Sequence, residues 1–122
     1  MLARLTFNGF HALVRACEAP VEWRAVNEAH ADLHGAIVAA ADSPRIEAAH
    51  RALSGELRLF LLQLEPLWTP QRMAADHVAL VAGLEREGPA VLRAHLRESA
   101  AALAAAQQDT GRPRRVGDAP AR

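Results

Sequence analysis

The sequence predicts an all-α protein built as an antiparallel helical bundle of about five helices. Aromatic residues make up only 4% of the 122 residues and tyrosine is absent, a composition that favours helices over strands. Apolar residues make up 51% of the chain, which is enough for one domain to bury a core. Four prolines, Pro20, Pro44, Pro70 and Pro89, also stand just before segments whose apolar residues recur with helical spacing.

These prolines set the expected helix boundaries. Proline suits the first position of a helix, because its missing N–H needs no partner there. Ser43 and Thr69 directly precede two of the prolines and are expected to act as N-caps. The helices are therefore expected at residues 3–18, 20–41, 44–65, 70–86 and 89–107.

The spacing of apolar residues predicts which face of each helix points inward. The side chains expected to point inward include Phe10, Leu13 and Cys17 on the first helix, Val26, Leu33 and Ile37 on the second, Ile46, Leu53 and Leu57 on the third, Met73, Leu80 and Leu84 on the fourth, and Leu92, Leu96 and Leu103 on the fifth.

The connections between these segments are short, so successive helices are expected to pack as antiparallel neighbours. The helical domain is predicted to span residues 1–108. Apolar periodicity stops there, and the Gly/Pro/Arg-rich residues 109–122 are expected to form a disordered tail.

Charge and cysteine content exclude several classes of function. Fourteen arginines balance fourteen acidic residues, and without a basic block the segment is not expected to contact nucleic acid directly. The single cysteine, Cys17, cannot form an internal disulfide and suits a reducing compartment. The sequence contains neither an apolar run long enough to span a membrane nor a signal-peptide pattern. We therefore expect a cytoplasmic protein with no membrane partner.

Histidines on the predicted inward faces point to metal chemistry. His30 and His34 are four residues apart and project from one face of a helix, as a two-ligand clamp for a metal ion does. His77 and His95 lie on the inward faces of two further helices, so four imidazoles would meet if these helices surround one centre. The alternative is that each histidine is a core residue bonded to a carbonyl, although each would then need its own partner. His50 shares an inward face and is interpreted as chiefly structural.

Three motifs carry a resemblance to a known family. Residues 30–46, HADLHGAIVAAADSPRI, resemble a helix with the pattern Asp-x-x-x-His followed by small residues and Asn-Pro. Residues 76–81, DHVALV, resemble an acidic-His-x-x-Ile/Leu-Leu stretch, and residues 93–96, RAHL, resemble a closing Arg-x-His-Leu. In this order and spacing they resemble the FCD domain, the effector-binding C-terminal domain of FadR-type regulators in the GntR family, over about residues 10–107.

The resemblance implies a metal site and an effector pocket. It makes His34, His77 and His95 ligands, and His30 takes the position of the family's aspartate. An all-imidazole set favours Zn²⁺ or Ni²⁺ over Mn²⁺. The implied effector is a small organic acid, because a site with neutral ligands keeps the positive charge of the ion. Arg58 and Arg93 are candidates to bind this carboxylate, and the alternative for each is a solvated surface arginine.

The implied function is metal-dependent sensing that controls DNA binding allosterically in a GntR-type regulator, with a homodimer expected from the family. The family's winged helix-turn-helix is absent from this sequence, which suggests either a fragment or a shortened relative. An enzyme is not expected, because no Glu or Asp shares the histidine faces as a general base and the sequence lacks a Glu-x-x-His motif. A helical-bundle metalloenzyme and a purely structural dimerisation module remain the alternatives.

Overall fold

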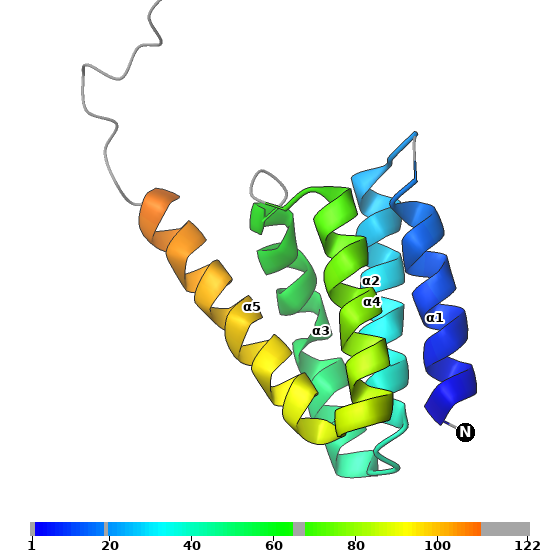
Figure 1. Cartoon of the computed structure of the whole chain (residues 1–122). Coiled ribbons are helices and arrows are strands. Elements are labelled where there is room, and N and C mark those ends of the chain that lie inside the picture. The colour runs from blue at the N-terminus through cyan, green and yellow to red at the C-terminus, as the bar shows by residue number, and fades with distance from the viewer. Residues whose placement is uncertain (1, 19, 65–67, 111–122) are drawn as a thin grey trace, which may run out of the picture.

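Helices account for the secondary structure of the chain. A computed structural model describes residues 2–18, 20–64 and 68–110, and these residues contain no strand (Figure 1). The helices are α1 (Leu2–Ala16), α2 (Trp23–Ala39), α3 (Pro44–Leu64), α4 (Pro70–Glu87) and α5 (Pro89–Thr110). The predicted all-α class is confirmed. No helix in these three stretches is long and apolar enough to cross a membrane.

Both ends of α4 have the local chemistry that the sequence predicts. The Thr69 side chain accepts a hydrogen bond from the Arg72 amide at 3.1 Å, and Pro70 follows as the first helical residue. At the other end, the Gly88 amide donates to the Leu84 carbonyl at 3.2 Å. Gly88 has a φ of 76°, in the region that glycine enters without steric cost. This turn lets α5 begin at once with Pro89.

Several predicted boundaries differ from the structure, including those of α1, which spans Leu2–Ala16 where residues 3–18 are predicted. Pro20 does not begin a helix, because α2 starts at Trp23 after an extended Glu22 and ends at Ala39. The chain reverses direction at both ends of this helix, and the residues that flank the helix form these turns. In the turn that follows α2, Asp42 adopts a positive φ of 49°. At the C-terminal end, α5 continues to Thr110, two residues past the predicted domain limit. Residues 111–122, most of the predicted tail, lie outside the described stretches.

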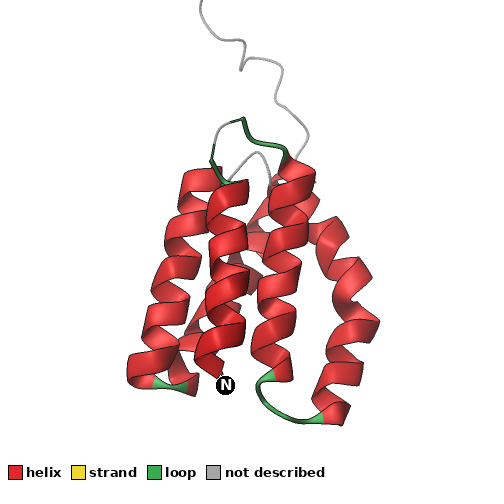
Figure 2. Cartoon of the chain, turned by 90° about the vertical axis from the view of Figure 1, so that its right-hand side faces the viewer, coloured by secondary structure: helices red, strands yellow, loops and turns green. Residues whose placement is uncertain are grey.

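The helices form a ring around a shared interior. α1 packs on α2 and α4, α3 packs on α2 and α5, and α4 also packs on α5. The order around the ring is therefore α1, α2, α3, α5, α4, with the connections at the two ends of the bundle (Figures 1 and 2). The expectation that successive helices are neighbours is not met for α3 and α4, whose described residues do not pack closely. α4 instead covers the inward faces of α1 and α2.

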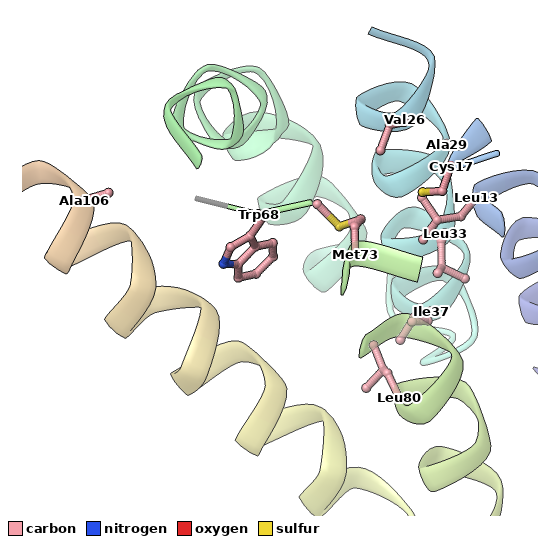
Figure 3. Packing of buried hydrophobic residues seen from close by; sticks show 10 residues of the cluster. All are labelled: Leu13, Cys17, Val26, Ala29, Leu33, Ile37, Trp68, Met73, Leu80 and Ala106. Carbon is pink, nitrogen blue, oxygen red and sulfur yellow. The ribbon is translucent and has the colours of Figure 1, made fainter. Parts of the chain in front are cut away.

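The apolar core lies mainly among α1, α2 and α4, which we call the packed half. Leu13, Val26 and Leu33 are fully buried there, and Met73 and Leu80 are almost fully buried (Figure 3). Helix α1 approaches α2 so closely that a Cβ on Gly9 would lie 3.3 Å from the Leu33 Cα. Close packing of this kind fixes the position of α2 and of the side chains that α2 directs toward the interior.

The other side of the bundle, formed by α3, α5 and the face of α2 that they cover, is more open, and we call it the hollow half. Helix α5 leans away from α3 and α4 toward its C-terminal end (Figure 1). The predicted inward face of the third helix is partly right, because His50 and Leu57 line a cavity, whereas Ile46 and Leu53 are exposed and do not line it. The charged Glu47 and Arg51 border the same cavity. Apolar periodicity does not identify charged residues of this kind.

Candidate metal centre

Three predicted metal ligands meet in the interior of the ring. His30 and His34 come from successive turns of α2, and His77 comes from α4. One ligand atom from each of these three residues lies within 4.8 Å of the other two. His77 is fully buried and His30 is only 6% exposed. α2 and α4 therefore direct three imidazoles toward one another across the interior, where water is largely excluded.

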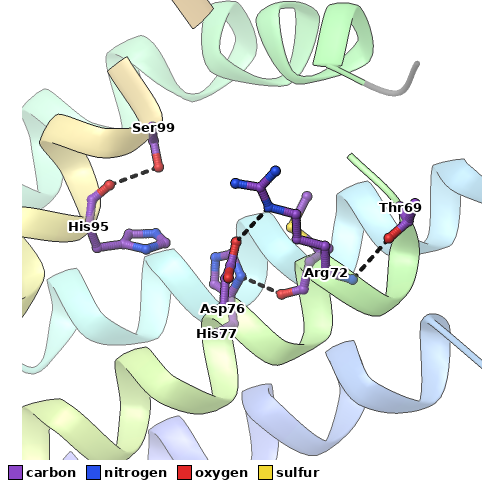
Figure 4. Close-up of polar contacts among 7 residues, drawn as sticks. Thr69, Arg72, Asp76, His77, His95 and Ser99 are labelled. Carbon is purple, nitrogen blue, oxygen red and sulfur yellow. Dashed lines mark hydrogen bonds and ion pairs between the residues drawn. The ribbon is translucent and has the colours of Figure 1, made fainter. Parts of the chain in front are cut away.

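A backbone hydrogen bond fixes the orientation of His77. Its Nδ1 lies 2.8 Å from the Met73 carbonyl oxygen one turn earlier (Figure 4), so Nδ1 carries the proton and donates it. The Nε2 of a neutral His77 then presents its lone pair to the interior. Metal-binding histidines in proteins are typically oriented by this kind of bond from the second ring nitrogen.

The Nε2 atoms of His34 and His77 face each other across 3.2 Å. Without an ion, the His34 Nε2–H donates to the His77 Nε2. Two nitrogens bound to one tetrahedral zinc at ordinary bond lengths are about 3.4 Å apart. The pair therefore already has nearly the separation that a shared ion requires.

His30 contributes a buried nitrogen without a protein partner. Its Nδ1 is shielded from solvent and accepts or donates no hydrogen bond among the described residues. Such an orphaned polar atom costs free energy in a folded protein. Coordination of a metal ion at this position would remove that cost. The donor set thus fits a divalent cation.

His95 lies beside this trio rather than within it. Its ring stacks on His34 with the centroids 5.3 Å apart and meets His77 edge-on at 4.8 Å. It extends from α5 toward His77 (Figure 4). Its backbone carbonyl accepts a hydrogen bond from the Ser99 hydroxyl at 2.9 Å. The structure therefore brings all four predicted histidines together, with three close enough to share an ion and the fourth at the edge.

Burial keeps these imidazoles neutral at physiological pH. Loss of hydration lowers the pKa of His30 to about 2 and that of His34 to about 3, and neighbouring histidines lower both further. Burial also lowers the pKa of His77 to about 4, although its bond to the Met73 carbonyl opposes the shift. The pKa of His95 is lowered by burial too. Neutral imidazole is the form that binds metal ions.

The histidines border a cavity of about 420 Å³ between α2, α3 and α5. His30 and His34 form part of its wall, and the predicted effector-binding Arg58 also lines it. Arg93 is exposed on α5 and is not among the residues that line this cavity. The sequence analysis did not identify Arg51 as a cavity residue and interpreted His50 as structural, yet both line the wall. The signal for them was their spacing with Glu47 and Ser54, which places all four on one side of α3.

A second cavity, of about 260 Å³, lies between α4 and α5 on the other side of His95. Asp76 lines it and pairs with Arg72 at 3.6 Å. Its negative charge opposes the fall in the pKa of His77. Trp68 and Ser99 line both cavities. The histidine cluster thus has cavities on two sides.

Comparison with known proteins gives the family. A model of the FCD domain matches residues 4–102, which includes all four histidines of the cluster. Comparisons with curated proteins and with solved structures gave no significant match. FCD domains are effector-binding domains of GntR-type transcription regulators rather than enzymes. The match extends over most of the chain and contains every residue of the site, so this protein belongs to the FCD domain family.

Proposed function

We propose that this FCD domain senses a small organic acid through a divalent metal ion held by His30, His34, His77 and His95. The observation that supports the proposal best is the buried trio of His30, His34 and His77, with two Nε2 atoms 3.2 Å apart and an unpartnered Nδ1 on His30. A core that needed histidines only for packing would give each imidazole a partner of its own.

The ligand chemistry favours Zn²⁺ or Ni²⁺. Imidazole nitrogen suits both ions, whereas Mn²⁺ prefers carboxylate and water oxygen. The position at which the family has an aspartate is His30 here, so the proposed set contributes no negative charge. The bound ion would keep its charge and attract a carboxylate from the adjoining cavity. Arg58 adds positive charge at the wall of that cavity.

Effector binding would act on DNA recognition by linkage. A ligand shifts a conformational equilibrium only through the difference in its affinity for the two states. The cavity is bounded by α2, α3 and α5, so a bound effector would favour one spacing of α5 relative to α3. In a homodimeric regulator, that spacing would bias the positions of two winged-helix domains, which lie outside this sequence.

Metal titration of the purified protein tests the proposal. We expect one equivalent of Zn²⁺ or Ni²⁺ to bind by calorimetry and to raise the melting temperature, with about 2.7 kcal/mol of stabilisation at a free metal concentration 100 times Kd. The double variant His34→Ala/His77→Ala should lose this binding. The exposed His11 on α1 provides the matched control, and His11→Ala should bind like the parent protein.

The carboxylate response requires a second measurement. Acetate or citrate should raise the melting temperature of the metal-loaded protein and should have less effect after treatment with a chelator. A protein that binds no metal and folds equally well with chelator would contradict the proposal and support a structural role for the histidines. Turnover of a carboxylate would instead indicate a metalloenzyme.

A further inference from the structure

The α3 wall of the large cavity beside the histidine cluster changes from polar to apolar along its length. Its volume is about 420 Å³, within the range of small-molecule sites in proteins. On α3, the residues lining its first part are polar or charged, namely Glu47, His50, Arg51 and Ser54. Further along the same helix, Leu57 and Leu61 line it, and Arg58, which is exposed, is the charged residue in this part of α3.

Other helices continue the apolar part of the wall. Leu103 lines it from α5, and the indole of Trp68 lies in the space between the start of α4 and α5 (Figure 3). Trp68 is only 8% exposed. At about 1.5 Å per helical residue, Leu61 lies roughly 16 Å along α3 from His50, and Leu103 lies roughly 12 Å along α5 from His95. The cavity is therefore long enough for a ligand that begins at the histidines to extend a chain or a ring to its apolar end.

This distribution of side chains should favour organic acids that carry one carboxylate over acids with several polar groups. A carboxylate directed at the histidine cluster would lie near a bound cation and beside His50 and Arg51. A second or third carboxylate, or several hydroxyls, would be placed against Leu57, Leu61 and Leu103, where most of the wall offers no hydrogen-bond partner. An alkyl or aryl body would instead be removed from water there, at a gain of about fourfold in affinity for each methylene buried.

We propose that the effector is a monocarboxylate with an apolar body. Its carboxylate faces the histidine cluster, and its alkyl chain or ring lies along the cavity toward Trp68. This inference rests on the proposed metal-dependent function and adds the chemical class of the effector.

Calorimetry on the full chain loaded with Ni²⁺ tests the class directly. We expect affinity to rise by up to about 250-fold from butyrate through hexanoate to octanoate, because four more methylenes are buried. Octanedioate has the same chain length as octanoate but carries a second charge at its far end, so it should bind at least tenfold more weakly. Citrate should also bind more weakly than octanoate. Equal or tighter binding of citrate or octanedioate, or no dependence on chain length, would overturn the proposal.

Variants of α3 locate the effect in the cavity. Leu57→Asn and Leu61→Asn should remove most of the gain from butyrate to octanoate, so octanoate should lose far more affinity than butyrate. Leu59 is on the same helix, is 66% exposed and does not line the cavity, so Leu59→Asn is the matched control. An equal loss of octanoate affinity in Leu59→Asn would contradict the assignment. Circular dichroism and the melting temperature check that each variant folds.

The outcomes separate this inference from the function on which it rests. If nickel binds and citrate is the preferred ligand, the proposed function stands and the apolar effector is wrong. If no metal binds and octanoate is still preferred over octanedioate, the apolar cavity is supported and the metal-dependent function is wrong.

Discussion

The packed half and the hollow half of the bundle use the same residue types in different ways. In the packed half, leucines such as Leu13 and Leu33 are fully buried. In the hollow half, leucines on α3 such as Leu53 and Leu57 are 53% and 40% exposed. Both sets recur with helical spacing, so periodicity alone does not distinguish a core face from a face beside a cavity. Contact with a neighbouring helix makes the difference.

The histidine cluster lies where these halves meet. α2 and α4 belong to the packed half and hold His30, His34 and His77 in fixed positions, and α5 brings His95 from the hollow half. A rigid side therefore supplies the three closest ligand atoms. The open side supplies space for a ligand. This division suits a sensor, which needs a fixed binding centre beside an element that can move.

The largest contrast is expected from leucine truncation in the two halves. Leu33→Ala should lower the free energy of unfolding by about 2–5 kcal/mol, because it leaves a cavity in close-packed surroundings. Leu57→Ala should change it by no more than about 0.5 kcal/mol, because this side chain is already partly exposed. Urea unfolding of both variants measures the difference. Equal losses would show that the two halves are packed alike.

Alanine substitutions of two glycines should change the free energy of unfolding in opposite directions. A Cβ on Gly83 would lie 2.8 Å from the Val91 Cγ1, where α4 meets α5, so Gly83→Ala should cost about 1–3 kcal/mol. A Cβ on Gly55 of α3 would meet nothing within 4 Å, so Gly55→Ala should stabilise by about 0.5–1 kcal/mol. Thermal unfolding checks both signs. Stabilisation by Gly83→Ala would mean that the α4–α5 contact is looser than described.

The pH dependence of the metal-free protein tests the boundary between the halves. Burial lowers the pKa of His30 to about 2 and that of His77 to about 4, below the value of about 6.5 in an unfolded chain. As the pH falls below 6.5, the unfolded chain binds protons that the folded chain does not, so folding is destabilised. The full stability is present above pH 6.5. Each such histidine contributes a slope of about 1.4 kcal/mol per pH unit between its two pKa values.

A single substitution isolates one contribution to this slope. His30→Leu should reduce the slope of unfolding free energy against pH by about one histidine's share, measured by urea unfolding with chelator between pH 5 and pH 7. An unchanged slope in His30→Leu would contradict burial of a neutral imidazole at this position.

A modest effect is expected at the start of α4, the helix that carries His77. Thr69→Ala removes the side-chain acceptor of the Arg72 amide and should cost about 1 kcal/mol. Thr69→Ser keeps the hydroxyl and should retain most of the stability. A shift in melting temperature measures both. No loss in Thr69→Ala would indicate that water replaces the cap.

Most of the fold could be predicted from local features. The cap at Thr69 and the prolines at positions 44, 70 and 89 give three helix starts as the structure has them. The helix start predicted at Pro20 is wrong because a proline also suits an extended connection. The residues around Pro20 form the turn between α1 and α2. The family resemblance predicted which histidines would meet, since the motifs preserve order and spacing even where the single signals are short.

The sequence by itself determined that the chain is helical and where most helices begin, because capping, proline geometry and helical spacing act over a few residues. Tertiary structure decided that α5 rather than α4 lies beside α3, and that α3 turns His50 and Arg51 toward a cavity while Leu53 stays exposed. Those outcomes depend on how whole helix surfaces compete for neighbours. The packing energy depends on contacts between helix faces that are distant in the sequence, so a local sequence pattern does not predict it.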